Sequence, residues 1–382
     1  CPGAGRPETG LIQPSPRGTR PRSVIVIGAG LVGRSCAWLL QGRGHQVQLL
    51  DPCLNGAPDP TAGSWAALGV VMAHVFQRSS GRAWRLRQRS LHLWGRWRQE
   101  LGEQGWPLAW QPGLLILASS PTDLERQQRL QSERQRQAIP LEIWSRQRLA
   151  NLSPALPDGA VGGLYSPADG QLDPGPALQA LLGDGRRLGI QTCGEAAARL
   201  ERRSDQWTVH TQAGQALQAE AVVLSAGVAS AGLLEPLDHF LPLEPVLGQA
   251  LELELPPGTH WGPSPAWPGA VVWQGLNLVP RPPSQTQGER LWLGATLEPG
   301  CRADPDALAA LRELGGAAPT WLRQAQLVRH WQGHRPHPIG RPAPLLEQLE
   351  PGLVLASGHY RNGLLMAPAT AEWVAQQLEA PS

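Results

Sequence analysis

The sequence contains no lysine, and all 33 of its basic residues are arginine. Lysine is the residue that forms Schiff bases with carbonyl substrates and with pyridoxal phosphate, so amino-acid enzymes of that type are excluded. The 31 acidic residues leave a net charge of only +2. A chain with so little basic excess lacks the electrostatic signature of nucleic-acid binding, and we expect no nucleic-acid partner.

Cysteine and long apolar runs are also scarce. The five cysteines are odd in number, scattered and free of C-x-x-C spacing; they are Cys1, Cys36, Cys53, Cys193 and Cys301. This pattern favours neither a disulfide framework nor a metal site, and a reducing, cytoplasmic compartment is expected. Because the sequence has no run of about 18 apolar residues, we expect no membrane span.

What the sequence does contain is a glycine motif between a strand and a helix. Four aliphatic residues at 24–27 precede Gly28, Gly30 and Gly33, in the spacing Gly-x-Gly-x-x-Gly, and a run of helix formers follows. Gly28 permits a tight turn, Gly30 leaves room for a pyrophosphate, and Gly33 allows the helix to pack closely on the strand. The helix N-terminus can then face the phosphates of a dinucleotide.

A second strand, expected at 45–50, ends in Asp51. At this place a carboxylate can accept hydrogen bonds from ribose hydroxyls. The same carboxylate repels a 2′-phosphate, which argues against NADP and leaves NAD and FAD open. Strand, glycines, helix, second strand and acid together predict a dinucleotide site.

Four further segments resemble the D-amino-acid oxidase and glycine oxidase family of FAD enzymes. They are the small-residue segment 63–71, the apolar strand and turn 221–227, the segment 331–336 and the C-terminal stretch 357–370. With the glycine motif they stand in family order, and the resemblance extends from residue 23 to the C-terminus. In that family the first of these segments runs beneath the isoalloxazine ring.

The resemblance implies an α/β fold: a two-dinucleotide-binding, Rossmann-like FAD domain with an inserted α+β substrate domain built on an antiparallel sheet. The FAD domain is expected at 23–78, 155–235 and 332–382, and the substrate domain at 79–154 and 236–331. Residues 1–22 are rich in Pro, Gly and Arg, and we expect them to form a disordered leader.

By the same resemblance, FAD binds non-covalently, because no cysteine lies between Arg335 and Arg361, where sarcosine oxidases place their flavin-linking cysteine. The residues expected to contact FAD are Gly28, Ala29, Gly30, Gly33, Asp51, Ser64, Trp65, Gly69, Ala196, Ala226, Gly227, Gly358, Asn362, Gly363 and Leu364. A helix beginning near Leu364 would set its positive end at the flavin edge that becomes negative on reduction.

For the substrate, the resemblance implies that Arg335 grips the carboxylate of an amino acid and that Arg361 lines the same pocket. The other expected catalytic residues are His334, Tyr360 and Asn277. Among the histidines, His334 and His359 are the best candidates for proton transfer, although a packing role is favoured for each. Hydride transfer from the substrate to the flavin needs no dedicated acid or base, so the lack of an obvious catalytic dyad is compatible with an enzyme.

The sequence departs from glycine oxidase where the substrate is chosen. Asn277 stands where the family pattern has a tyrosine, and Leu297 and Val70 also depart from it. Glycine specificity is therefore open, and we expect a small amino acid of the glycine, sarcosine or D-amino-acid type. Oxygen is the expected electron acceptor, with hydrogen peroxide as its product.

Three other interpretations remain. The chain could be a dehydrogenase of the same fold that passes electrons to a quinone or a carrier. It could be a domain that removes a carboxymethyl-type group from RNA, against which the near-neutral charge argues. It could also be a flavin-binding scaffold without enzymatic activity. A homo-oligomer is compatible with all of these.

Overall fold

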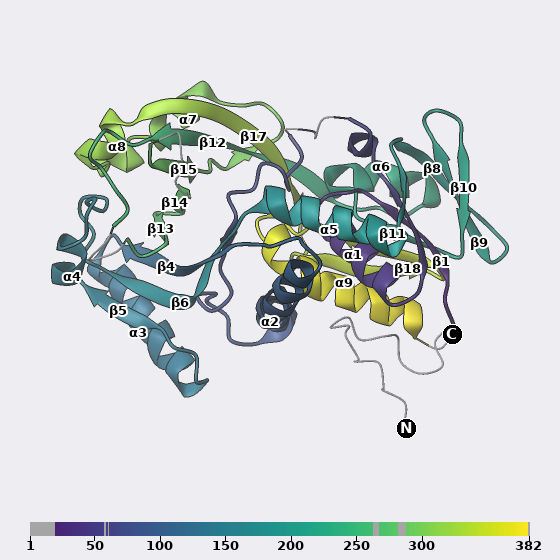
Figure 1. Ribbon diagram of the computed structural model, residues 1–382, viewed down its shortest axis with the longest axis horizontal. Coiled ribbons are helices and arrows are strands. Elements are labelled where there is room, and N and C mark those ends of the chain that lie inside the picture. The colour runs from purple at the N-terminus through teal and green to yellow at the C-terminus, as the bar shows by residue number, and fades with distance from the viewer. Residues whose placement is uncertain (1–19, 57–58, 60, 263–266, 282–287, 381–382) are drawn as a thin grey trace, which may run out of the picture.

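A computed structural model of the chain describes residues 20–56, 59, 61–262, 267–281 and 288–380. Residues 1–19 of the expected leader therefore lie outside the described part. Two sheets, one six-stranded and one ten-stranded, organise the described chain (Figure 1). No helix within it is long and apolar enough to cross a membrane.

The six-stranded sheet begins from the strand of the glycine motif. Its order is β18 (Leu345–Glu350), β19 (Leu353–Ser357), β11 (Ala221–Leu224), β1 (Ser23–Ile27), β2 (Gln46–Leu50) and β7 (Gln191–Cys193). All neighbours pair in parallel except β18 with β19. Its central strands are buried on both faces, which explains their nearly continuous aliphatic sequences.

Different elements pack against the two faces of this sheet. Val24 and Val26 pack among helices, whereas Ile25 and Ile27 pack against a second, small sheet. The helices are α1 (Leu31–Gly42), α2 (Gly81–Glu103), α5 (Pro174–Leu188) and α9 (Gly363–Glu379). The small sheet consists of β8 (Ala197–Arg203), β9 (Gln206–Thr211) and β10 (Ala216–Ala219), with α6 (Ser230–Leu234) beside it. The first sheet is thus enclosed between a helical layer and a β layer.

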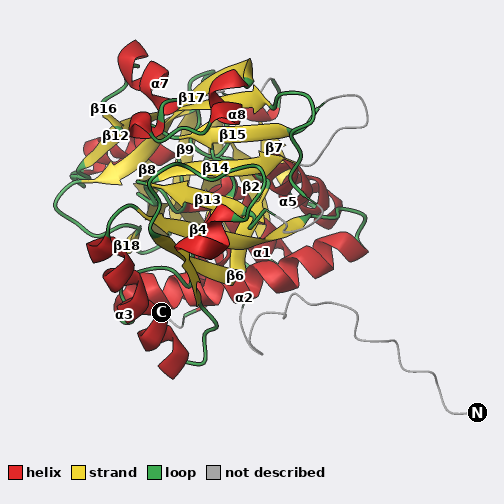
Figure 2. Cartoon of the chain, turned by 90° about the vertical axis from the view of Figure 1, so that its left-hand side faces the viewer, coloured by secondary structure: helices red, strands yellow, loops and turns green. Residues whose placement is uncertain are grey.

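The ten-stranded sheet forms the other half of the molecule, and Figure 2 looks onto it. Its order is β16 (Glu298–Pro299), β12 (Leu243–Glu254), β15 (Arg290–Gly294), β14 (Leu276–Arg281), β13 (Ala270–Trp273), β4 (Trp110–Ala118), β6 (Gly162–Leu172) and β3 (Val70–Val71), with β17 (Gln326–Pro338) paired to β12 and β5 (Glu142–Ser145) to β6. Most neighbours are antiparallel, but β13 and β4 are parallel.

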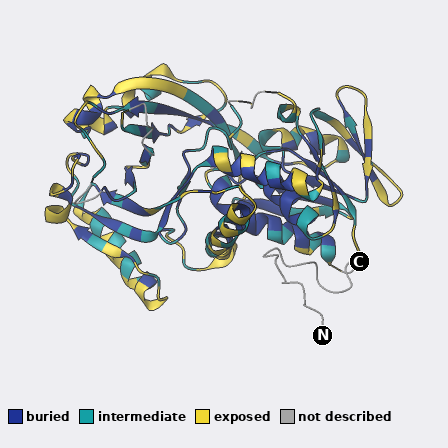
Figure 3. Ribbon diagram, in the orientation of Figure 1, coloured by how far each residue is buried: buried dark blue, intermediate teal, exposed yellow. Residues whose placement is uncertain are grey.

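Four helices lie on this second half: α3 (Pro121–Arg136), α4 (Arg146–Ala150), α7 (Pro305–Leu311) and α8 (Thr320–Gln324). Short 3-10 turns complete the described chain at Pro52–Leu54, Gly227–Ala229, Glu235–Leu237 and Leu314–Gly316. The helix α3 begins at Pro121, after the N-cap residue Ser120, whose side chain accepts the N–H of Asp123. The helix is amphipathic, with most of its polar residues exposed (Figure 3).

The mixed α/β class with an antiparallel substrate sheet is confirmed. One detail concerns the expected domain ranges. The strands β3 and β6 fall inside the ranges expected for the FAD domain, yet they belong to the ten-stranded sheet. The division into two domains at those boundaries stays a prediction.

Candidate active site

The expected cofactor residues gather at one edge of the six-stranded sheet. Gly28 follows β1, Asp51 follows β2, Ala226 and Gly227 follow β11, and Gly358 follows β19. These are the carboxyl ends of parallel strands, and the chain reverses its direction across the sheet between β1 and β11. Such a switch point opens the crevice in which α/β sheets bind nucleotides.

Two glycines of the motif serve packing. A Cβ on Gly28, whose φ is +100°, would lie 2.5 Å from the carbonyl oxygen of Ser225 at the end of β11. A Cβ on Gly33 would lie 1.8 Å from the carbonyl oxygen of Gly28. The turn therefore fits only because both positions lack a side chain.

Gly30 and Ser64 face each other at the N-terminus of α1. The Ser64 Oγ accepts a hydrogen bond of 2.9 Å from the N–H of Leu31, and a Cβ on Gly30 would lie 2.9 Å from the same oxygen. Gly30 is the N-cap of α1, and a side chain at this position would meet the Ser64 hydroxyl. Backbone N–H groups and the helix dipole at this end suit an anionic group such as a pyrophosphate.

The carboxylate of Asp51 is held in place by two backbone groups. Its Oδ2 accepts from the N–H of Ala29 at 2.7 Å, and its Oδ1 accepts from the N–H of Cys53 at 2.8 Å. Each oxygen keeps a further lone pair, so the fixed carboxylate can still accept from ribose hydroxyls. Ala196 lies on the link after β7, whose Cys193 carbonyl accepts the N–H of Asp51 at 3.1 Å.

The segment 61–69 joins the glycine motif to the second sheet. At one side Ser64 contacts the start of α1. At the other side, Ala62 forms a bridge with His334 on β17, and the indole of Trp331 donates to the Ala66 carbonyl at 3.1 Å. Gly69, with φ of +84°, lets the chain pass Leu172, whose carbonyl would lie 2.6 Å from a Cβ there.

Arg335 lies beside this segment on β17, half-buried. Its Nη1 donates to the carbonyls of Leu247 at 3.2 Å and of Thr296 at 3.1 Å. A Cβ on Gly248 would lie 2.1 Å from Nη2, so the guanidinium lies over the glycine of the neighbouring strand. In the described residues no carboxylate forms an ion pair with Arg335. Its Nε and Nη2 donors are left for another acceptor.

A second cation stands close to the first. Burial first and the positive charge of Arg361 second lower the pKa of Arg335 to about 10, although Tyr360 and Glu298 act to raise it. The group is therefore still charged at neutral pH. Tyr360 connects β17, which carries Arg335, to the segment that carries Arg361. Its ring centre lies 4.4 Å from that of His337, and its N–H donates to the Pro336 carbonyl at 3.2 Å.

The helix α9 begins at Gly363, two residues after Arg361, with Asn362 as its N-cap residue. The Leu364 carbonyl accepts the indole N–H of Trp94 at 2.9 Å, and Ala369 donates to Ser90 on the same helix α2. These contacts fix the start of α9 within the helical layer.

The two candidate histidines differ in their surroundings. His359 is buried, its Nε2 lies 2.9 Å from the Thr370 Oγ1, and burial followed by the charge of Arg82 lowers its pKa to about 3. It is neutral at ordinary pH and packs α9 against β19. His334 alternates with Arg335 along β17, and its buried Nε2 has no partner in the described structure.

Asn277 lies on β14 with 8% of its surface exposed. Its Nδ2 donates to the Gly294 carbonyl at 3.1 Å, which fixes the amide, and its buried Oδ1 has no donor among the described residues. The carbonyls of Gly294 and Thr296, two residues apart, thus hold Asn277 and Arg335 respectively. An unpaired buried acceptor is costly unless a ligand supplies a donor.

Three residues around Arg335 escaped the sequence analysis. Gly248 makes room for the guanidinium, and a glycine inside an apolar strand is a signal for such a close approach. Glu298 and Gln249 lie behind Thr296: the Thr296 hydroxyl donates to Glu298, and Gln249 donates to Glu298 at 3.0 Å. No local pattern marks these two, because they meet only through strand pairing.

Comparisons with known proteins bear on this site. A family described as FAD dependent oxidoreductase (DAO) matches residues 23–377. Glycine oxidase of Bacillus licheniformis is 26% identical over 361 residues, which cover 93% of this chain and 92% of that protein. The bifunctional protein ThiO/ThiG of a Synechocystis species is 28% identical over 91% of this chain, which spans 50% of that relative's length.

Solved structures agree with the sequence comparison. Glycine oxidase from Geobacillus kaustophilus superimposes with a TM-score of 0.82 at 26% identity, covering 94% of this chain and 95% of the other. An iminodiacetate oxidase from a Chelativorans species shares the fold, with a TM-score of 0.78 at 22% identity and coverage of 94% and 96%.

Proposed function

Since the chain belongs to the DAO family of FAD-dependent oxidoreductases, which matches residues 23–377, we propose that it oxidises the C–N bond of a small amino acid to an imine and passes the electrons to oxygen. The family is one of FAD-dependent oxidoreductases, and the glycine oxidases similar to this chain support the oxidation of an amine. The amino acid and the oxygen step are the proposed parts.

The residues at the sheet edge fit FAD. Gly30 and Ser64 at the start of α1 would receive the pyrophosphate, and the fixed carboxylate of Asp51 would receive the ribose. Beside Gly227, whose φ is +58°, a Cβ would meet nothing within 4 Å, which leaves open space for the cofactor next to β11. When bound, FAD supplies the acceptor for a hydride from the α-carbon of the substrate.

The observation that carries the proposal is the pair Arg335 and Arg361. Two guanidinium groups lie close enough to depress the pKa of Arg335, and no carboxylate of the described chain neutralises that residue by an ion pair. A planar guanidinium with its Nε and Nη2 donors free binds a carboxylate bidentately. The α-carboxylate of an amino acid supplies the missing charge and orients the α-carbon.

The remaining polar groups would orient the substrate without transferring protons. Asn277 offers its fixed Oδ1 to the N–H of the substrate amine, which satisfies a buried acceptor. His359 is neutral and engaged with Thr370, so it holds α9 in place. With no lysine in the chain, the arginines and the N-terminus of α9 are the positive groups that would favour electron transfer to oxygen.

The first test is the cofactor and its reduction. Purified protein should be yellow and release intact FAD on acid precipitation, because no cysteine is placed to link it. A screen of small amino acids under anaerobic conditions should bleach the flavin. Flavin that stays on the denatured polypeptide, or no bleaching with any amino acid or amine, would contradict the proposal.

The second test addresses Arg335. Arg335→Ala should retain FAD and raise the apparent substrate constant for an amino acid. The loss of substrate binding free energy should be roughly 2 to 5 kcal/mol, the scale for breaking a buried charge pair. Arg335→Lys should recover part of the loss, because it keeps the charge and loses the fork. The decarboxylated amine is the control: if Arg335→Ala weakens both compounds equally, the residue is no carboxylate ligand.

The third test separates oxygen from another acceptor. With a substrate that reduces the flavin anaerobically, air should restore the oxidised spectrum and yield one peroxide per substrate. Reduced flavin that persists in air but is reoxidised by a quinone would assign the chain to the dehydrogenases.

A further inference from the structure

Glu298 is a buried carboxylate behind the strand that holds Arg335 in place, with 8% of its surface exposed. It accepts hydrogen bonds from the Thr296 hydroxyl, from the Gln249 amide at 3.0 Å and from the N–H of Asp304 at 2.6 Å. Among the described residues no cation forms an ion pair with it. Burial of a charge is costly unless hydrogen bonds replace those of water, and these three donors do so.

The hydrogen bonds around Glu298 require its ionised form. The Thr296 hydroxyl oxygen accepts the backbone N–H of Gln249 at 2.8 Å, and its own proton is donated to Glu298. The amide of Gln249 donates both to Glu298 and to a backbone carbonyl. The groups that hydrogen-bond to Glu298 in the described chain therefore act as donors, and none accepts a proton from a neutral carboxyl. Glu298 places a negative charge in the interior of the protein.

Glu298 and Arg335 lie on opposite sides of β12. The guanidinium of Arg335 lies over Gly248, whereas Gln249, the next residue of the strand, points to the other face and meets Glu298. Thr296 contacts both charges: its carbonyl accepts from Nη1 of Arg335 at 3.1 Å, and its hydroxyl donates to Glu298. The two charges are thus separated by backbone and by one residue, which prevents an ion pair and leaves them within electrostatic reach.

The charges around the proposed carboxylate site leave one positive charge in excess. Burial and then the charge of Arg361 lower the pKa of Arg335, and Glu298 acts against them. Arg335 and Arg361 together carry two positive charges, and Glu298 carries one negative charge. One carboxylate of a ligand would make this group neutral. A second carboxylate would add a negative charge that only Glu298 faces from behind, and like charges repel.

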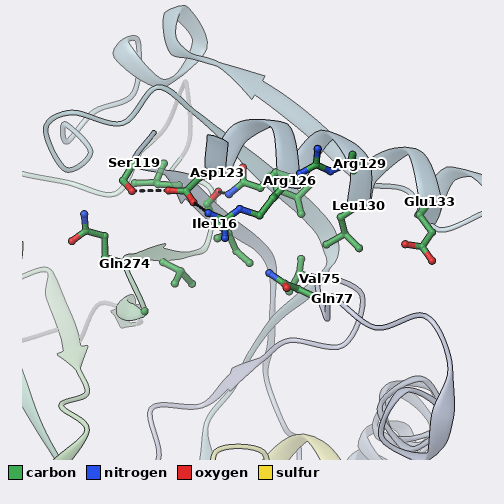
Figure 4. Close-up of a pocket in the computed structure, with 15 residues that line it drawn as sticks. Val75, Gln77, Ile116, Ser119, Asp123, Arg126, Arg129, Leu130, Glu133 and Gln274 are labelled. Carbon is green, nitrogen blue, oxygen red and sulfur yellow. Dashed lines mark hydrogen bonds and ion pairs between the residues drawn. The ribbon is translucent and has the colours of Figure 1, made fainter. Parts of the chain in front are cut away.

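The cavity between α3 and the ten-stranded sheet differs in this respect (Figure 4). It measures about 390 Å³, and none of the residues expected at the active site lines it. Its charged residues balance one another; they are Asp123, Arg126, Arg129 and Glu133. Arg126 and Asp123 are in direct contact at 2.8 Å, so their charges are satisfied without a ligand. At Arg335 the strand keeps cation and anion apart, and the donors of the cation stay open to a ligand.

We propose that Glu298 is a specificity-determining residue: its buried negative charge restricts the site at Arg335 to substrates with a single carboxylate and disfavours those with two. This inference rests on the proposed amino-acid oxidation. Amino acids with a neutral side chain fit the charge of the site, whereas a carboxylate on the side chain or on the nitrogen substituent does not. Glu298 contacts neither substrate nor FAD in this arrangement and acts through its charge alone.

The test measures the binding of acetate and malonate to the holoenzyme at pH 8, through the change that each anion causes in the flavin spectrum. The wild type should bind acetate more tightly than malonate. Glu298→Gln keeps the shape of the side chain and removes its charge, so both anions should bind more tightly. Malonate should gain about 10-fold more than acetate, because a dianion interacts with the removed charge twice as strongly.

Two variants separate charge from structure. Thr296→Val removes the hydrogen bond to Glu298 and keeps every charge, so the ratio of malonate to acetate affinity should stay as in the wild type. Glu254→Gln changes the net charge of the protein by the same amount as Glu298→Gln. It lies near the other end of β12, where Glu254 pairs with Arg290, and it should also leave the ratio unchanged.

Several results would overturn the inference while leaving the proposed function intact. Glu298→Gln could weaken both anions equally, which would show that Glu298 only supports the position of Arg335. The wild type could bind malonate as tightly as acetate, or Glu254→Gln could shift the ratio as much as Glu298→Gln.

Two further measurements keep the inference testable. If Glu298→Gln fails to fold, proton uptake by the wild type decides: malonate should bind with uptake of about one proton and acetate with none, and malonate bound without a proton counts against the inference. If neither anion changes the flavin spectrum, the same ratio is taken from flavin reduction by aspartate and alanine of one configuration. If no amino acid reduces the flavin, the proposed function itself fails and this inference with it.

Discussion

The guanidinium of Arg335 occupies the space above Gly248: a Cβ at that glycine would lie 2.1 Å from Nη2 and 2.3 Å from Nη1. The two residues belong to the paired strands β12 and β17. Because Nη1 is also held by the Leu247 and Thr296 carbonyls, the position of the guanidinium is determined by backbone atoms alone. A change at Gly248 therefore moves the proposed carboxylate ligand without removing its charge.

Gly248→Ala should displace Arg335 and weaken amino-acid binding. The clash involves the end of a flexible side chain, so the strand and the bound FAD should persist while the apparent substrate constant rises about 10-fold, or 1.4 kcal/mol. Anaerobic reduction titrations with an amino acid and its decarboxylated amine measure the effect. Gly95→Ala on α2, where a Cβ would meet nothing within 4 Å, is the control. An equal loss for both compounds would show that the change acts elsewhere.

Gly30 and Gly33 should respond differently to alanine. At Gly33 the new Cβ would lie 1.8 Å from a backbone oxygen, so overpacking should lower the free energy of unfolding by roughly 1 to 3 kcal/mol or more. At Gly30 it would meet the Ser64 side chain, which can turn away, so the chain should fold and lose FAD affinity. Thermal unfolding and flavin titration separate the two. A stable Gly33→Ala protein, or unchanged FAD binding in Gly30→Ala, would contradict these assignments.

Arg134→Met should loosen the loop at 72–79. The buried guanidinium of Arg134 donates to the carbonyls of His74 at 2.8 Å and of Phe76. Its Cζ atom lies 4.1 Å from the centre of the Trp84 ring. Loss of these bonds leaves buried carbonyls unpaired, which should cost roughly 3 kcal/mol. Amide hydrogen exchange should rise in that loop first. Arg136→Met, at the exposed end of α3, is the control and should change neither quantity.

His359 should make the fold sensitive to acid. Its pKa is 6.5 in the unfolded chain and about 3 in the fold, so the unfolded chain binds the proton first. The contribution to stability is complete above pH 6.5 and is lost as the pH falls toward 3, by up to about 1.4 kcal/mol per pH unit. In urea unfolding from pH 8 to 5, His359→Gln should show a shallower decline than the wild type. Thr370→Val keeps the imidazole of His359, so the free energy of unfolding should fall with decreasing pH as steeply as in the wild type. An equal pH dependence in all three proteins would refute a contribution from His359.

The parts that the sequence could predict are local. The aliphatic run before Gly28, the helix after it and Asp51 at the end of the second strand each depend on residues close in the chain, and β1, α1 and β2 lie where these patterns placed them. The family resemblance added the FAD cofactor and the class of reaction, which the comparisons confirm. The roles of the individual site residues remain proposals.

The parts that the sequence could not predict depend on strand pairing. The strand β6 contains Gly, Pro and Asp and lacks a strand pattern, yet it pairs with β4 and β5 inside the ten-stranded sheet. The contact of Gly248 with Arg335 also depends on strand pairing. The buried carboxylate of Asp169 accepts the N–H groups of Ala73 and His74, which are distant in the sequence. Propensity and spacing carry no information on such register.

The strand order of the six-stranded sheet has a consequence for how the protein is made. The strand β1 precedes every other strand of this sheet in the sequence, but one of its two neighbours is β11, and the next strand along, β19, lies far beyond β11 in the sequence. The turn at Gly28 thus packs against Ser225 only after all the residues between them have been synthesised. Contacts between such distant segments slow folding and leave the early strands exposed meanwhile. Until then β1 lacks one of its two neighbours, and its unpaired edge is open to association with other chains.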